Sequence, residues 1–159
     1  MEQLNDRVLV GVTSGLCGFL VKNAMSRILK ATRVTKTDTL DKAATMFIRP
    51  RRRPEPKAVA VGTLADAVTS SLCGVGITYM LSVSGGDQAT VKGALSGAAL
   101  WLTMFGGLSS LGITPNHPVD PVSAIGSFVT NTAFGAVTAA AAVRIGSPEL
   151  YNGKMPLHK

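Results

Sequence analysis

The chain has 159 residues, of which 46% are hydrophobic and only 16% are charged, and it carries a formal net charge of +7. An ordinary soluble domain has roughly 25% charged residues, whereas several apolar segments here offer water no polar face. A soluble helical bundle is therefore disfavoured, and the length indicates one domain over 1–159.

Four apolar segments follow one another along the chain, at residues 8–31, 58–83, 91–113 and 121–143. Each is long enough to cross a bilayer, which takes roughly 20 residues. The first segment ends with basic residues, and Asp66 is the only acidic residue in the second. The sequence therefore predicts an all-α fold, a four-helix transmembrane bundle.

The loop at residues 33–57 carries most of the positive charge, with eight basic and three acidic residues. Short loops rich in Lys and Arg stay on the cytoplasmic side of a membrane. We therefore expect a multi-pass protein of the bacterial cytoplasmic membrane, with this loop inside and both termini outside.

This loop has two predicted parts. Residues 37–48 have apolar side chains at helical spacing, which is typical of a short helix lying on the membrane surface. Prolines at 50, 54 and 56 exclude a helix over residues 49–57. We expect this second part to contact anionic lipid headgroups. The contacting residues are Arg49, Arg51, Arg52, Arg53 and Lys57.

The same loop has two alternative interpretations, a role in topology alone and a docking site for a specific partner. Nucleic acid is a poor candidate partner, since no aromatic residues alternate with the arginines.

One small-residue cassette recurs in the apolar segments: VTSGLCG at 12–18, VTSSLCG at 68–74 and, more loosely, VTNTAFG at 129–135. Helices in lipid associate by close backbone packing and by hydrogen bonds, which favours small residues at contacts. We predict helix packing at Gly11, Ser14, Gly15, Gly18, Gly62, Ser70, Gly74, Gly93, Gly97, Asn131 and Gly135. Asn131 is expected to form a hydrogen bond between helices.

The two cysteines, Cys17 and Cys73, lie at the sixth position of the cassette in the first and second segments, and a small apolar thiol suits a packed helix interface. In antiparallel neighbouring helices their axial offset disfavours a disulfide. The chain has two Cys and two His, and both histidines lie outside the apolar segments. Neither a metal site nor a cofactor is expected.

Asp66 is the one acidic residue within an apolar segment, and Lys22 is the most deeply placed basic one. If the first two segments are antiparallel neighbours with their cassettes at equal depth, Gly15 faces Ser71 and the two charges reach nearly the same level. We therefore predict an intramembrane ion pair between Lys22 and Asp66. Charges inside a membrane are often functional, so a proton- or ion-coupled site is the alternative to a structural pair.

The second half of the chain resembles small bacterial four-helix membrane proteins of the YagU-like kind. The resemblance is carried by VKGALSGAALWLTMFGGLSSLGI at 91–113 and DPVSAIGSFVTNTAFGAV at 120–137. It implies a glycine-spaced helix with a tryptophan, a proline-rich turn, and a helix with a polar residue before an aromatic-Gly pair. The matching residues are Gly93, Gly97, Trp101, Pro121, Asn131, Phe134 and Gly135, with Asn131 where that pattern often has His.

Motifs of nucleophilic, phosphate-binding or zinc-dependent enzymes are not found in the sequence. We therefore expect a non-enzymatic integral membrane protein, a packing or assembly subunit of a homo-oligomer or of a larger complex of membrane proteins. The alternative is a small transporter or channel component that uses the Asp66 and Lys22 pair. A membrane-bound enzyme ranks third.

Overall fold

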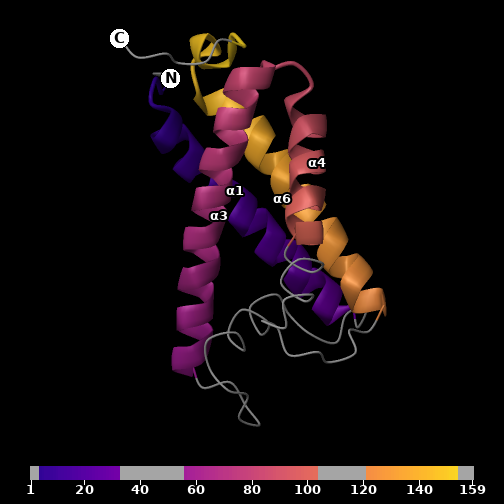
Figure 1. Ribbon diagram of the computed structural model, residues 1–159. Coiled ribbons are helices and arrows are strands. Elements are labelled where there is room, and N and C mark those ends of the chain that lie inside the picture. The colour runs from indigo at the N-terminus through magenta and orange to yellow at the C-terminus, as the bar shows by residue number, and fades with distance from the viewer. Residues whose placement is uncertain (1–3, 33–55, 104–120, 154–159) are drawn as a thin grey trace.

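The computed structural model describes residues 4–32, 56–103 and 121–153, which form an all-α bundle (Figure 1). Helix α1 spans Arg7–Ala31, α3 spans Pro56–Ser84, α4 spans Ala89–Leu102 and α6 spans Pro121–Ile145. A short 3-10 helix, η2, follows at Pro148–Tyr151. The prediction of an all-α bundle of four helices is confirmed.

The helix ends have local causes. The Asp6 side chain caps α1 by accepting hydrogen bonds from the amides of Val8 and Leu9, at 2.7 and 3.2 Å, which satisfies amides that lack a partner at a helix start. Helix α3 ends before Gly85, whose φ of +85° is a conformation that glycine adopts readily. Gly85 thus begins the short turn between α3 and α4.

One predicted boundary is wrong. Residues 49–57 were expected to be non-helical throughout, but α3 already begins at Pro56. Proline is tolerated in the first turn of a helix, because its missing amide hydrogen would have no partner there. Lys57 therefore belongs to the first turn of α3.

Other predictions fall outside the described residues. These are the surface helix at 37–48, the cluster Arg49, Arg51, Arg52 and Arg53, and the second half of the segment 91–113. The described part of that segment forms α4, which ends at Leu102.

The helices alternate in direction, so that the start of α1, the turn between α3 and α4, and η2 lie at one end of the bundle (Figure 1). Helix α1 packs along both α3 and α6, and α4 packs along α6, whereas α3 and α4 make few contacts. The spatial order is therefore α3, α1, α6 and α4.

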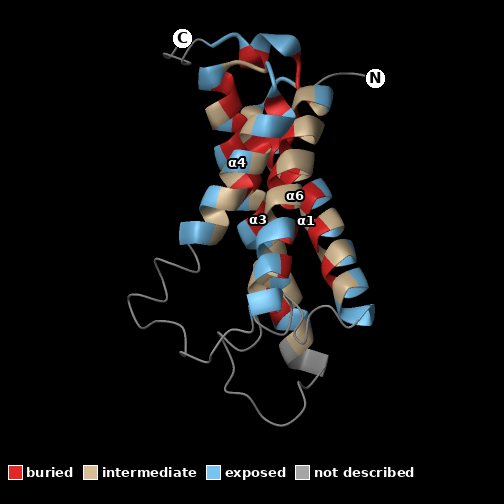
Figure 2. Cartoon of the chain, turned by 90° about the vertical axis from the view of Figure 1, so that its right-hand side faces the viewer, coloured by how far each residue is buried: buried red, intermediate tan, exposed pale blue. Residues whose placement is uncertain are grey.

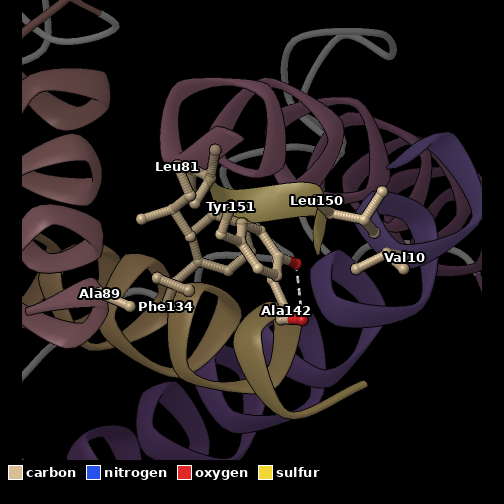
Figure 3. Packing of buried hydrophobic residues seen from close by; sticks show 9 residues of the cluster. Val10, Leu81, Ala89, Phe134, Ala142, Leu150 and Tyr151 are labelled. Atoms are coloured by element: carbon tan, nitrogen blue, oxygen red, sulfur yellow. Dashed lines mark hydrogen bonds between the residues drawn. The ribbon is translucent and has the colours of Figure 1, made fainter. Parts of the chain in front are cut away.

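A hydrophobic cluster lies between the helices and η2 (Figure 3). Its buried members are Val10, Ile77, Leu81, Ala89, Phe134, Ala139, Ala142, Leu150 and Tyr151. The N-terminal segment joins this end because the amide of Leu4 donates to the carbonyl of Ile145 at 3.0 Å, and the amide of Ser147 donates to the carbonyl of Leu4 at 3.1 Å. These two hydrogen bonds hold Leu4, just before α1, against the residues at the end of α6.

Tyr151 fixes η2 to this cluster, since its hydroxyl donates to the carbonyl of Ala142 at 2.7 Å (Figure 3). Burial raises the pKa of Tyr151 to about 12, partly opposed by the charge of Arg7. Because the folded state favours the neutral phenol, this contact stabilises the fold below pH 10 and its contribution is lost as the pH rises towards about 12.

A spectrophotometric titration tests this assignment. The chain has two tyrosines, so subtracting the tyrosinate absorbance of Tyr151→Phe from that of the wild type isolates Tyr151. We expect the difference to titrate near pH 12. A midpoint near pH 10, the ordinary value for the phenol, would contradict the buried hydrogen bond.

Small and hydroxyl-bearing residues lie between the helices, whereas much of their outer surface is apolar. Figure 2 shows where the described chain is buried and where it is exposed. Among the described residues, the largest fully buried side chains are Leu81 and Val10, followed by five Thr or Ser: Thr78, Thr130, Thr138, Ser14 and Ser82. Large apolar side chains on all four helices are exposed instead, for example Leu20, Leu64, Leu72, Leu95 and Ile125.

Within the described residues, three helices are long and apolar enough to cross a membrane: Arg7–Ala31, Val59–Ser84 and Pro121–Ile145. They correspond to the first, second and fourth predicted segments. The described part of α4 has 14 residues, which is shorter than the roughly 20 residues that a bilayer requires.

Candidate functional site

Lys22 and Asp66 lie face to face between α1 and α3. The Lys22 Nζ is 2.5 Å from the Asp66 Oδ1, and the two side chains are 8% and 11% exposed. The spacing of residues favours this arrangement, because Lys22 lies one turn after Gly18 in α1 and Asp66 lies one turn before Ser70 in α3. The structure thus brings together the two charges that the sequence singles out.

Two further residues complete this site, and sequence reasoning did not identify either of them. The Asn23 side-chain amide donates to the carbonyl of Phe19 at 2.9 Å and to the second Asp66 oxygen at 3.5 Å. From α6, the Phe134 ring lies 5.5 Å from the Lys22 Nζ, a cation–π distance. The signal for Phe134 was the cassette VTNTAFG, where it precedes the glycine.

The ion pair is held at the end of a seam of small residues between α1 and α3. A Cβ added to Gly15 would lie 2.9 Å from the Cα of Ser71 and still closer to the carbonyl oxygen of Ser70. A Cβ added to Gly74 would lie 2.6 Å from the Cα of Gly15. The two backbones therefore touch where the cassettes meet, and Gly15 faces Ser71 as the overlay at equal depth expects.

The other predicted residues of these two helices are also buried. Gly11 faces the backbone of Val75, and the Ser14 hydroxyl donates to the carbonyl of Gly11 at 3.1 Å. Gly62 and Ser70 are buried on α3. The seam of small residues is thus used inside the bundle and does not form an outward face for other subunits.

A second seam joins α4 to α6. A Cβ added to Gly135 would lie 2.9 Å from the Cα of Gly97, and one added to Gly93 would lie 2.9 Å from the carbonyl carbon of Gly135. Gly97 in turn faces the carbonyl group of Asn131. The predicted packing role of these four residues thus corresponds to backbone contacts.

The interhelical hydrogen bond expected of Asn131 differs from what is observed. Its side-chain amide donates to the carbonyl of Ser127, one turn earlier in α6, at 2.8 Å. Among the described residues, no bond from this amide to α4 is found. The backbone of Asn131 makes the contact instead, because Gly97 has no side chain to separate the two helices.

Gly18 joins α1 to α6. A Cβ at this position would lie 2.8 Å from Cδ2 of Phe134 and still closer to the Thr138 hydroxyl. The same glycine therefore brings α6 close enough for Phe134 to reach Lys22, one turn further along α1.

The expectation for the cysteines holds only in part. Cys73 is partly buried and packs against the hydrophobic cluster, whereas Cys17 is exposed. The helical period explains the difference, because Cys17 lies next to Gly18 in sequence and so points away from the contact that Gly18 makes. Both thiols are free.

The arrangement is a neutralised pair of charges at the junction of α1, α3 and α6. Within the described ranges, no three His, Cys, Asp or Glu side chains are grouped so as to hold a metal ion. The chain matches no protein-family model, no curated protein and no solved structure.

Proposed function

We propose that this chain is a non-enzymatic integral protein of the bacterial cytoplasmic membrane, acting as a packing or assembly subunit. The observation that carries the proposal is the distribution of side chains, with hydroxyls and glycines at the contacts between helices and many large apolar residues on the exterior. Such an exterior is unfavourable in water but matches lipid. Close backbone seams at glycine are the means by which membrane helices associate.

The orientation is supported by the described charges. At the end where α1 finishes, Arg27 and Lys30 are exposed and basic, and the basic loop 33–57 follows directly. At the opposite end three acidic residues, Asp6, Asp87 and Glu149, are offset by three basic ones, Arg7, Lys92 and Arg144, so the described charges there sum to zero. The positive-inside rule then assigns the first end to the cytoplasm, where Arg49, Arg51, Arg52, Arg53 and Lys57 are proposed to contact anionic headgroups.

Since the glycine seams are used within the bundle, the surface open to another subunit is the apolar exterior. A second candidate function, a small transporter or channel component, is favoured by the burial of Lys22 and Asp66 in the bundle. The two functions differ in whether Lys22 and Asp66 must separate: a transport cycle requires it, whereas a packing subunit does not.

Reporter fusions test location and orientation. We expect the protein to stay in the membrane fraction after alkaline carbonate extraction. A fluorescent reporter inserted within residues 49–57 should be active in the cytoplasm, and alkaline phosphatase fused after Lys159 should be active outside. An external reading for the basic segment, or release of the chain by carbonate, would contradict the proposal.

The assembly role is tested by purification in mild detergent and native mass spectrometry. A stable complex, with further copies or with other membrane proteins, is the expected result. A monomer that supports a substrate-dependent ion flux in liposomes would favour the transporter instead.

A further inference from the structure

The seam between α1 and α3 has a close counterpart in the seam between α4 and α6. Helix α1 carries GVTSG at 11–15 and α4 carries GALSG at 93–97, so both present the pattern G-x-x-S-G. An aromatic residue followed by leucine comes after each pattern at the same distance, at 19–20 and at 101–102. Motifs of small residues recur by chance in membrane helices, so the contacts decide whether this likeness is structural.

The contacts match position by position. Gly15 faces the carbonyl oxygen of Ser70, the third residue of the cassette in α3, and Gly97 faces the carbonyl oxygen of Asn131, the third residue of the cassette in α6. The last residue of each cassette then faces the same glycine across the seam. A Cβ on Gly74 would lie 2.8 Å from the amide nitrogen of Gly15, and a Cβ on Gly135 would lie 2.8 Å from that of Gly97.

From this correspondence we infer that the chain contains an internal duplication. It consists of two copies of one helix hairpin, α1–α3 and α4–α6, and the two helices of each hairpin pack on one another. The burial pattern follows the same alignment. Ile77 and Leu81 are buried in α3, and Thr138 and Ala142 are buried at the corresponding positions of α6. A chance recurrence of small residues in the sequence would not produce equivalent backbone contacts and the same buried face in both hairpins.

The direction of the helices defines the kind of repeat. Helices α1 and α4 both run away from the end of the bundle where η2 lies, and α3 and α6 both return to it (Figure 1). The two hairpins therefore have the same orientation, and in the spatial order α3, α1, α6 and α4 the second hairpin lies beside the first. Parallel repeats of this kind occur in membrane proteins.

The two copies differ where the candidate site lies. Leu100 occupies the position in α4 that corresponds to Gly18, and Ser127 occupies the position in α6 that corresponds to Asp66. Glycine at 18 lets α6 approach α1 closely, whereas the bulkier leucine keeps the equivalent helices α4 and α3 apart, which agrees with their few contacts. The ion pair with its aromatic neighbour is thus a specialisation of the first hairpin.

Distances between spin labels in the full chain test the duplication. Corresponding exposed positions are Leu20 with Leu64 in the first hairpin and Leu102 with Ile125 in the second. Each pair is changed to cysteine in a background of Cys17→Ala and Cys73→Ala, then labelled and measured by double electron–electron resonance. We expect the two distance distributions to coincide within one helical turn, about 5 Å. A larger separation between their maxima would overturn the inference.

A second measurement compares corresponding glycines. Gly15→Ala and Gly97→Ala are expected to lower the stability in detergent equally, as are Gly74→Ala and Gly135→Ala, within about a factor of two in the unfolding constant. Gly76 has no atom within 4 Å of an added Cβ, so Gly76→Ala is the control without loss. If the two substitutions in α4 and α6 were as silent as this control while those in α1 and α3 were harmful, the duplication would be refuted.

Discussion

Asp66→Asn is expected to destabilise the bundle more than the double substitution Lys22→Met with Asp66→Leu. The single change leaves the Lys22 ammonium buried among α1, α3 and α6 without its counter-charge, and removing one partner of a buried pair costs about 3 to 5 kcal/mol. Replacing both charges by apolar side chains of similar size is often neutral. The double variant should therefore recover most of the lost stability.

Unfolding in a titration of denaturing detergent measures this difference, followed by the fluorescence of Trp101, the single tryptophan. Arg27→Met is the matched control, because Arg27 lies on the same helix but is exposed, and it should be nearly silent. A double variant less stable than Asp66→Asn would show that the two charges do not act as a pair.

The same double variant separates the two candidate functions. A subunit that only needs α1 and α3 joined should still assemble when both charges are gone. A transporter that uses Asp66 to carry a proton or an ion should lose its flux, even where the bundle has regained its stability.

Gly15→Leu is expected to disrupt the packing of α1 on α3, with a loss of about 3 kcal/mol or more, the upper part of the range for overpacked sites. The obstacle is backbone on both sides, the carbonyl of Ser70 and the Cα of Ser71, and backbone cannot move aside by changing a rotamer. The two helices must separate, and the distance between Lys22 and Asp66 must then increase.

Gly76→Leu provides the control for this substitution. Gly76 lies in α3 two residues from Gly74, but it is exposed and an added Cβ meets no atom within 4 Å. Leucine there should be tolerated or slightly stabilising, since glycine within a helix costs about 0.5 to 1 kcal/mol relative to alanine. Equal sensitivity to leucine at positions 15 and 76 in detergent unfolding would show that the cassette has no packing role.

Local chemistry in the sequence determined the class of fold. Apolar segments of sufficient length, separated by glycines, prolines and charges, specify helices whatever their partners are, and α1 and α6 agree with the predicted segments to within two residues. The pairing of Lys22 with Asp66 also followed from the sequence. Aligning the repeated cassettes of two antiparallel helices fixes the register between them. With about 1.5 Å of rise per residue, that register places Lys22 and Asp66 at nearly the same level.

Contacts between helices that are distant in the sequence were decided only by the tertiary structure. The register between α1 and α3 does not determine where α6 packs. The Phe134 ring lies beside Lys22 because Gly18 lets α6 pack closely on α1, and this contact is seen only in the tertiary structure. The same limit explains Asn131, whose amide meets a carbonyl of its own helix while its backbone packs on Gly97. The equivalence of the two hairpins was likewise hidden, because small residues are common in apolar helices and only shared backbone contacts distinguish a repeat from composition.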